Sequence, residues 1–316
     1  MGRYILKRVL QAIPILIIVS VISFSLIKLA PGDPVQAFVT PKMSAAQVEM
    51  VRHNLGLDKP VYIQYLRWAS QVLKGDLGYS LVNYRPVTTQ ILERIPATLW
   101  LMGVSLVLSV ITGITLGLLS AFYKGKLTDN IISFFSYIGI SIPSFWFAMI
   151  LIVTFSSQLG ILPSVGMRTV GVNSFWDVLK HTIMPALVLS IQNTAIITRY
   201  IRTNAITQMK EDYVRTAVSK GLTLKRVFSK HVLRNVLLPI VTILGMSLPE
   251  LIAGAFITET IFGWPGMGRL GINSIFSFDY PLIMGITMLS SVMVILGNLI
   301  SDILYGIVDP RVKAVR

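Results

Sequence analysis

The feature that most constrains this chain is a series of apolar runs as long as a lipid bilayer is thick. Six of them occur within the 316 residues, at about 9–29, 97–122, 131–157, 182–201, 236–257 and 282–308. About 20 apolar residues in a helix, each rising about 1.5 Å, cross the ~30 Å hydrocarbon core. Because the core offers backbone groups no other partner, such runs form helices. The sequence therefore predicts an all-α membrane protein with six transmembrane helices.

The composition favours a membrane location over a soluble domain. Charged residues make up 13% of the chain, about half of the roughly 25% that is usual in soluble domains. A net charge of +14 is also typical of nucleic-acid binding. The basic residues, however, gather in the short segments between apolar runs, as membrane topology requires. We therefore exclude nucleic acid as a partner.

The basic residues also orient the chain. The predicted inner segments carry Arg3, Lys7, Arg8, Lys124, Lys126, Arg199, Arg202, Lys210, Arg215, Lys220, Lys225, Arg226, Lys230, Arg234, Arg311, Lys313 and Arg316. An even number of spans and this bias predict that both termini are cytoplasmic, in the inner (cytoplasmic) membrane. The first run exceeds the usual ~7–15 apolar residues of a signal peptide. We interpret it as an uncleaved membrane helix.

The runs divide the chain into unequal parts. We expect an N-terminal transmembrane helix at 1–29, an external segment at 30–95, a five-helix core at 96–308 and a cytoplasmic tail at 309–316. Turn residues at 31–34, 58–60 and 75–78 indicate a small folded cap in the external segment, with one helix near 61–73.

The most informative segment is a predicted cytoplasmic loop at about 203–235. Two short amphipathic pieces flank Gly221, which suits the left-handed residue that ends a helix, and Thr223 is placed to cap the next one. Two interpretations stay open. The loop is either a knob that binds a cytoplasmic protein or a basic amphipathic helix that rests on anionic lipid.

Two acids fall inside the predicted spans. Glu250 lies near the middle of the fifth run, where a charge costs about 2.5–3.5 kcal/mol or more. It either lines a wet translocation pathway and meets a substrate amine, or makes a structural hydrogen bond. Asp302, near the cytoplasmic end of the last run, is predicted to form a structural ion pair with a basic neighbour.

Smaller residues within the runs indicate how the helices pack. Gly113 and Gly117 make a pair that suits close helix packing, either within the chain or at a dimer seam. Pro143 and Pro185 predict kinks or helix ends.

The segment Val214-Arg215-Thr216-Ala217, followed by Gly221 and by His231-Val232-Leu233-Arg234-Asn235, resembles the coupling loop of permeases from binding-protein-dependent ABC importers. The usual family triplet is Glu-Ala-Ala, with a glycine four residues after the last alanine. The triplet here is similar to that of the family's peptide and nickel branch. The resemblance implies that the ATPase contact involves Arg215, Thr216, Ala217, Gly221, His231, Arg234 and Asn235.

Further segments resemble the same family in the same order, at residues 30–34, 55–60, 75–78, 259–268 and 302–311. The whole is most similar to the first permease subunit of dipeptide and oligopeptide importers. It implies a type I ABC importer permease fold, a second homologous permease subunit, two ATP-binding subunits and an external substrate-binding protein. Peptides are the expected substrate, and importers of nickel, glutathione or opines share these loops.

The chain lacks the Gly-x-x-x-x-Gly-Lys-Ser/Thr motif that cradles ATP phosphates. ATP and Mg²⁺ are therefore expected on partner ATPase subunits, with no cofactor in this chain.

The sequence also argues against a metal site and against two other classes of protein. The chain has no cysteine, and its three histidines, His53, His181 and His231, lack metal-ligand spacing. A self-contained secondary transporter would show inverted repeats and several intramembrane charges. An intramembrane enzyme would show a nucleophile and base, or a set of metal ligands. Neither pattern is evident, and we expect a non-catalytic transport subunit.

Overall fold

The computed structural model describes residues 2–29, 35, 43–54, 56–228, 232–233, 236 and 255–308. Every regular element in these ranges is a helix, and one isolated bridge pairs Tyr79 with Pro86. The helices are α1 (Gly2–Leu29), α2 (Ala45–Asn54), α3 (Val61–Leu73), α4 (Val87–Phe122), α5 (Leu127–Ser141), α6 (Ser144–Leu151), the π-helix η2 (Ile152–Gln158), α7 (Phe175–Gln208), α8 (Asp212–Ser219), α9 (Leu224–Val227), α12 (Phe256–Ile261), α13 (Met267–Phe276) and α14 (Tyr280–Val308).

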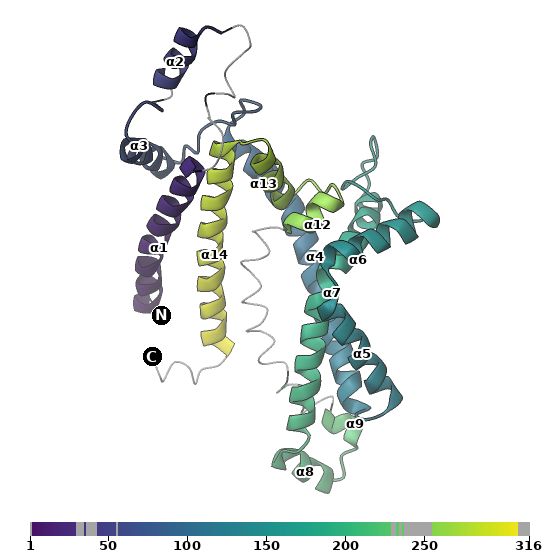
Figure 1. The fold of residues 1–316 in the computed structure, drawn as a ribbon. Coiled ribbons are helices and arrows are strands. Elements are labelled where there is room, and N and C mark those ends of the chain that lie inside the picture. Colours follow the sequence, from purple (N-terminus) through teal and green to yellow (C-terminus); the bar gives the residue numbers. More distant parts are fainter. Residues whose placement is uncertain are drawn as a thin grey trace.

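The long helices form two groups (Figure 1). In one, α1 lies beside α14; in the other, α4 and α7 run together with α5 against α7. The short helices α12 and α13 join the groups at one end, where α13 contacts both α4 and α14. That end also carries α3, and α8 and α9 lie at the opposite end of α7 (Figure 1).

Four of the six predicted spans correspond to helices that are long and apolar enough to cross a membrane. These are α1, α4, α14 and, as one broken unit, α5 with α6 and η2. The fourth predicted span lies within α7, which at 34 residues is long enough to cross but is more polar than α4. The fifth, at 236–257, lies almost wholly outside the described residues.

The third predicted span is sharply bent. The helix direction bends by 108° between its two halves, Leu127–Ser141 and Ser144–Gln158. Ile142 and Pro143 at the break both have extended backbone, with ψ of 127° and 131°. Proline lacks the amide that continues a helix and disfavours helical geometry in the residue before it, so the helix ends there and restarts at Ser144. The predicted kink at Pro143 is therefore a full change of direction.

The pairing of α4 with α7 depends on the two predicted small residues. A Cβ on Gly113 would lie 2.7 Å from Cγ2 of Ile197, and one on Gly117 would lie 2.6 Å from Cβ of Ile201. Both glycines are buried. The Gly113–Gly117 pair thus serves close packing within the chain, which was one of the two alternatives that the sequence left open.

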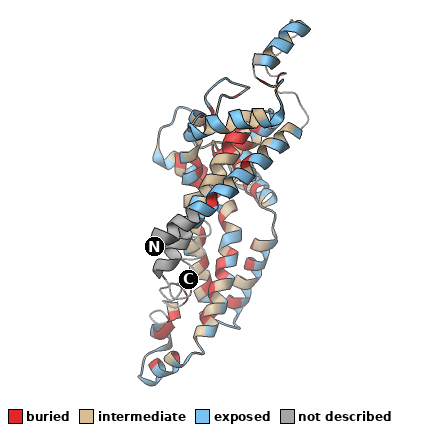
Figure 2. Cartoon of the chain, turned by 90° about the vertical axis from the view of Figure 1, so that its left-hand side faces the viewer, coloured by how far each residue is buried: buried red, intermediate tan, exposed pale blue. Residues whose placement is uncertain are grey.

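Burial is distributed unevenly over the two groups (Figure 2). Within residues 10–29 of α1, only Ala12 and Ser20 are buried, and apolar side chains such as Ile18 and Leu26 are more than half exposed. The core instead follows α4 and α7, where Leu101 and Ile201 are fully enclosed. An apolar surface of this kind on α1 suits a lipid environment.

The glycine contact predicts how substitutions on α4 change stability. Gly117→Ala forces Ile201 and α7 away, and should destabilise the fold by about 1–3 kcal/mol. Gly103→Ala on the same helix meets nothing within 4 Å of its Cβ and should be neutral or stabilising, since alanine favours helix. Thermal unfolding of the detergent-purified proteins measures both. Equal melting temperatures for the two variants would contradict this account of the packing.

Candidate coupling site

The predicted coupling loop folds as two helices packed on the ends of α4 and α7. Val214 and Ala217 of α8 join Val227 and Phe228 in one buried cluster with Ala121, Ile197, Ile201 and Ala205. The ring of Phe228 also meets that of Phe122 edge-on, at 5.6 Å between centroids. The apolar face of the loop is therefore turned inward, onto this chain's own helices.

The turn between α8 and α9 is a Schellman motif. The amide of Leu222 donates to the carbonyl of Ala217 at 3.2 Å, and that of Gly221 donates to Val218 at 2.9 Å. Gly221 has φ of +83°, the left-handed conformation that glycine adopts without cost. The prediction that Gly221 ends the first helix is confirmed. Thr223 directly precedes α9, and its carbonyl accepts from the amide of Val227 at 3.0 Å.

The opposite face of α8 is exposed. Arg215 and Thr216 both point away from the core, and the Arg215 side chain is 78% exposed beside Asp212. Val218 is an exposed apolar side chain on the same helix. The structure thus separates the predicted triplet: Ala217 packs against the bundle, whereas Arg215 and Thr216 are exposed and their side chains contact Asp212 of the same helix. His231, Arg234 and Asn235 lie outside the described residues.

A buried ion pair that the sequence analysis missed joins α5 to α7 near this site. Arg202 donates from Nε and Nη2 to the two carboxylate oxygens of Asp129, at 2.7 and 2.8 Å. The Ser120 hydroxyl and the Gly125 amide also donate to this carboxylate, which is only 2% exposed. One signal could have revealed it, because Asp129 is an acid at the start of an apolar run among basic segments.

Glu250, the predicted pathway residue, lies outside the described residues, and a different acid occupies the far end of the bundle. Glu259 of α12 is fully buried. Its carboxylate accepts from the Thr98 hydroxyl at 2.9 Å and from the Arg269 amide at 3.1 Å. Burial raises the pKa of this carboxyl, while these hydrogen bonds oppose the rise. Since Arg269 lies in the first turn of α13, Glu259 joins the start of that helix to α4.

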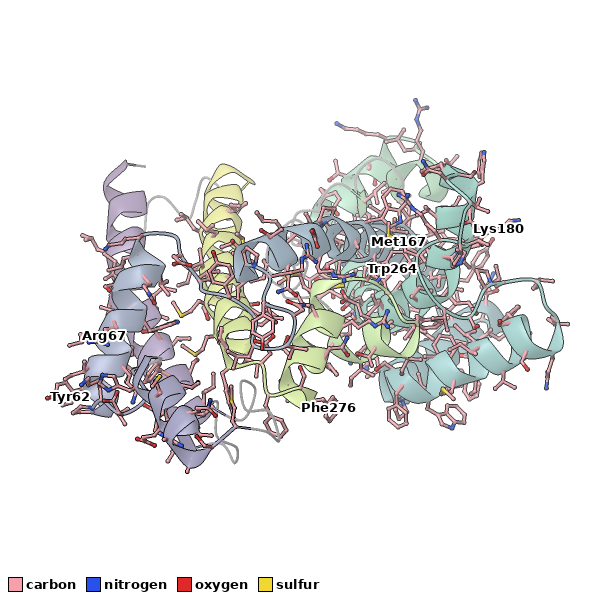
Figure 3. All side chains as sticks on the ribbon, turned by 90° about the horizontal axis from the view of Figure 1, so that it is seen from above. Tyr62, Arg67, Met167, Lys180, Trp264 and Phe276 are labelled. Carbon is pink, nitrogen blue, oxygen red and sulfur yellow. The ribbon has the colours of Figure 1, made fainter. Side chains whose placement is uncertain are left out.

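The loop around Glu259 is packed without space for larger residues. A Cβ on Gly266 would lie against the Glu259 carboxylate. Trp264 is fully buried near Met167 (Figure 3), and its indole donates to the carbonyl of Ala97 at 2.9 Å. This segment, which the sequence singled out only by resemblance, is a structural junction.

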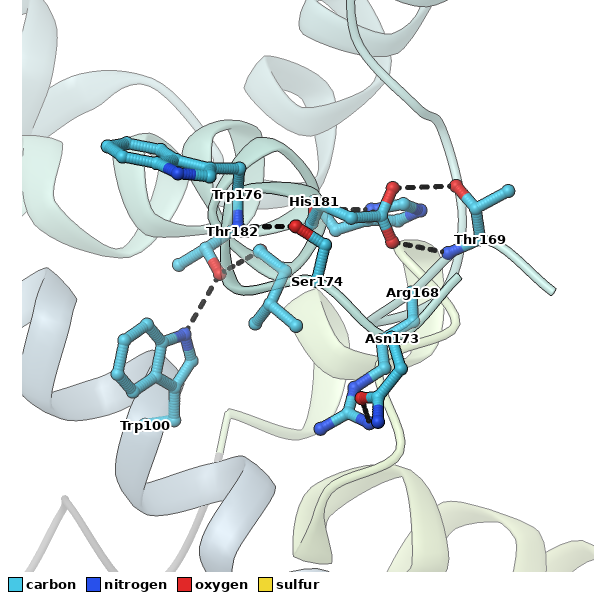
Figure 4. A network of polar contacts seen from close by, with 10 residues as sticks. Trp100, Arg168, Thr169, Asn173, Ser174, Trp176, His181 and Thr182 are labelled. Carbon is cyan, nitrogen blue, oxygen red and sulfur yellow. Dashed lines mark hydrogen bonds and ion pairs between the residues drawn. The ribbon is translucent and has the colours of Figure 1, made fainter. Parts of the chain in front are cut away.

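A second polar network joins the loop at 159–174 to the start of α7 (Figure 4). The Asp177 carboxylate accepts from the amide and hydroxyl of Thr169 at 2.7 and 2.8 Å. The hydrogen bond from the Thr169 amide lowers the pKa of Asp177. Trp100 of α4 donates to the Thr182 hydroxyl at 3.0 Å. These contacts bind the loop and α7 to α4.

Among the described residues, no group of three or more His, Asp or Glu side chains could hold a metal ion. His181 is buried in α7, with Nδ1 2.9 Å from the Asp177 carbonyl. This hydrogen-bond contact within α7 explains why the imidazole is buried, and no bound ligand is needed to explain it.

Two family models together match nearly the whole chain. Residues 113–314 match the binding-protein-dependent transport system inner membrane component, and residues 1–102 match the N-terminal part of such membrane components. The chain belongs to this family. The resemblance predicted from the loop motifs is therefore confirmed.

Curated relatives of this family match the chain from end to end. The oligopeptide transport system permease protein AppB of Bacillus subtilis is 44% identical over 315 residues, covering 99% of this chain and 100% of that protein. The glutathione transport system permease protein GsiC of Escherichia coli is 38% identical over 313 residues, covering 99% of each.

A solved structure shares the fold. The MetNI methionine ABC transporter, in an inward-facing conformation, matches with a TM-score of 0.55 at 17% identity, covering 70% of this chain and 97% of that one. The predicted all-α, type I importer permease fold is confirmed.

The Asp129–Arg202 ion pair predicts a loss of stability on removal of its charge. Asp129→Asn replaces a carboxylate that is 2% exposed by a neutral amide, opposite an Arg202 side chain that is 31% exposed, and should destabilise the protein by about 1–3 kcal/mol. Asp212→Asn removes a pair whose side chains are 78% and 96% exposed and should cost less than about 1 kcal/mol. Melting temperatures in detergent compare the two. A larger loss for Asp212→Asn would refute a structural role for the buried pair.

Proposed function

We propose that this chain forms half of the translocation channel of an ATP-driven importer for di- or oligopeptides. The observation that carries the proposal is the α8–α9 unit. Its apolar face packs against α4 and α7, while Arg215 and Thr216 remain exposed at the end of the bundle. Among the full-length relatives, an oligopeptide permease is 44% identical and a glutathione permease 38% identical. Peptides are therefore the first substrate to test, followed by glutathione, nickel and opines.

The remaining subunits supply what this chain lacks. Two ATP-binding subunits would hold ATP and Mg²⁺ and dock on the coupling helices of this chain and of a second, homologous permease. An external binding protein would deliver the substrate. This arrangement places α8, α9 and both termini in the cytoplasm, as the distribution of basic residues predicts.

The contacts of α8 indicate how a conformational change in the ATPase subunits is transmitted to the transmembrane helices. Ala217 and Val214 pack on Ile201 and Ala205 of α7, so a displacement of α8 moves α7 with it. Arg202, one residue beyond Ile201, is held by Asp129 of α5. The three helices α5, α7 and α8 therefore move together, and alternating access follows when this unit turns against the rest of the channel. Glu250 stays a candidate for the pathway that this motion opens.

The alternative that α8 and α9 rest on anionic lipid is less well supported. A helix bound to a membrane surface turns its apolar face to the lipid. Here Val214 and Ala217 face this chain's own helices and are buried. The face left over contains Arg215 and Thr216 and suits a polar protein contact.

The turn at Gly221 provides a test of coupling. A Cβ there meets nothing within 4 Å, so the cost of Gly221→Val comes from the positive φ, at about 1–2 kcal/mol. We expect this variant to insert normally but to lose substrate-stimulated ATP hydrolysis and transport in proteoliposomes. Gly221→Asn is the matched control, because asparagine tolerates this conformation, and it should retain most of the activity. Full coupling in the valine variant would argue against α8 and α9 as the transmitting element.

Isolation of the complex tests the assembly. A tagged chain extracted from native membranes in mild detergent should bring with it a second permease, ATP-binding subunits and ATPase activity that a peptide-loaded binding protein stimulates. Recovery of the chain alone, with solute movement along an ion gradient after reconstitution, would instead establish a self-contained secondary transporter.

A further inference from the structure

The amphipathic helix α3 (Val61–Leu73) has a face that no described part of the chain covers. Tyr62, Leu66 and Leu73 are 66%, 61% and 89% exposed. Their positions follow the spacing of one helix face, with Ala69 between them. In Figure 3, Tyr62 lies at the edge of the molecule. We call this set the α3 stripe.

The neighbouring face of α3 packs on α1. Tyr65 and Trp68 lie against Phe24, with ring centroids 5.5 and 5.9 Å apart. The Tyr65 hydroxyl lies 2.8 Å from that of Ser20. Ser20 and Phe24 lie in the last third of α1, whose candidate span is Leu10–Leu29. These contacts fix α3 beside the outer end of a membrane-crossing helix (Figure 1).

The face of α3 opposite the stripe holds the external segment. Gln64 donates from Nε2 to the carbonyls of Leu57 and Lys59, at 3.2 and 2.7 Å. The Arg67 guanidinium lies on the same side, since a Cβ on Gly56 would come within 2.9 Å of it. On a helix, positions 64 and 67 lie across from 62, 66 and 73. The α3 stripe therefore faces away from residues 56–59 of the external segment.

We propose that α3 is an interfacial helix whose stripe of Tyr62, Leu66 and Leu73 is immersed in the outer leaflet of the membrane. Helices of this kind lie in the plane of the interface, with the apolar face among the acyl chains and the polar face in water. Tyrosine and tryptophan are enriched at this depth, where the ring is apolar and its edge is wet. The chemistry that α3 recognises is thus a phospholipid surface.

This attachment would hold the external segment at the mouth of the channel. Residues 79–86, which follow α3, are fixed to the start of α14 through Asp279. The Ser80 hydroxyl and the Leu81 amide both donate to its buried carboxylate. With α3 in the lipid on one side and Asp279 on the other, the segment has two anchors. The inference is independent of the substrate and of the ATPase contact.

Single-cysteine labelling tests the depth of the α3 stripe directly. The chain has no cysteine, so Leu66→Cys and Arg67→Cys each give one site for an environment-sensitive fluorophore. The two positions are adjacent in sequence but on different faces, which makes Arg67→Cys the matched control. Leu73→Cys repeats the measurement at the other end of the stripe. The full complex is assembled in nanodiscs and exposed either to phospholipid with a nitroxide on the acyl chain or to aqueous iodide.

We expect the nitroxide lipid to quench the labels at 66 and 73 about twofold or more beyond the label at 67, with iodide giving the reverse order, as for an interfacial helix. Equal iodide quenching at 66 and 67 would place the stripe in water and overturn the proposal. Protection of 66 and 73 from both quenchers would overturn it too, because a protein subunit would then cover the stripe. Either failure leaves the coupling proposal untouched.

Discussion

The close approach of α4 and α7 is the constraint on which the rest of the structure depends. Gly113 and Gly117 allow the backbone of α4 to lie against Ile197 and Ile201, at a separation that no larger residue permits. The other elements of this group pack on these two helices. One end of this pair holds α8 and α9 through one apolar cluster, and the opposite end holds the junction around Trp264. In a membrane, where apolar side chains gain little by leaving lipid, such close packing supplies much of the association energy.

Three buried carboxylates fix the positions of the remaining helices. Asp129 joins α5 to α7, Glu259 joins the start of α13 to α4, and Asp279 joins the external segment to the start of α14. A buried charge is costly unless donors surround it. Each of these carboxylates accepts a hydrogen bond from another element. Moving either element would remove that donor and leave a buried carboxylate unsatisfied. This makes the junctions specific in a way that apolar contacts, which tolerate sliding, do not.

The sequence was sufficient for the fold class but not for these junctions. Bilayer-length runs and basic inner segments predicted α1, α4 and α14, and Gly221 was correctly placed as the end of α8. The sequence did not predict that Glu259 and Asp279 are buried, yet both are. Each has a partner more than 150 residues away, Thr98 for Glu259 and Ser80 for Asp279, and pattern alone does not reveal such pairs. The sequence predicted the position of the bend at Pro143 but not its angle. Proline determines where a helix ends, but it does not determine the direction of the helix that follows.

The two ends of α4 contact different parts of the chain. Where α4 meets α14, the contact lies within about the first three turns of both helices, from Val87 to Ile95 and from Leu282 to Leu289. A Cβ on Gly285 would come within 2.5 Å of the Val87 side chain. The coupling helices lie at the opposite end of α4, and 36 helical residues rising about 1.5 Å each separate the two by roughly 50 Å. Because α4 is one continuous helix, it links the cluster that holds α8 and α9 directly to the junction with α14. A single helix thus joins two parts of the chain that share no other described apolar cluster.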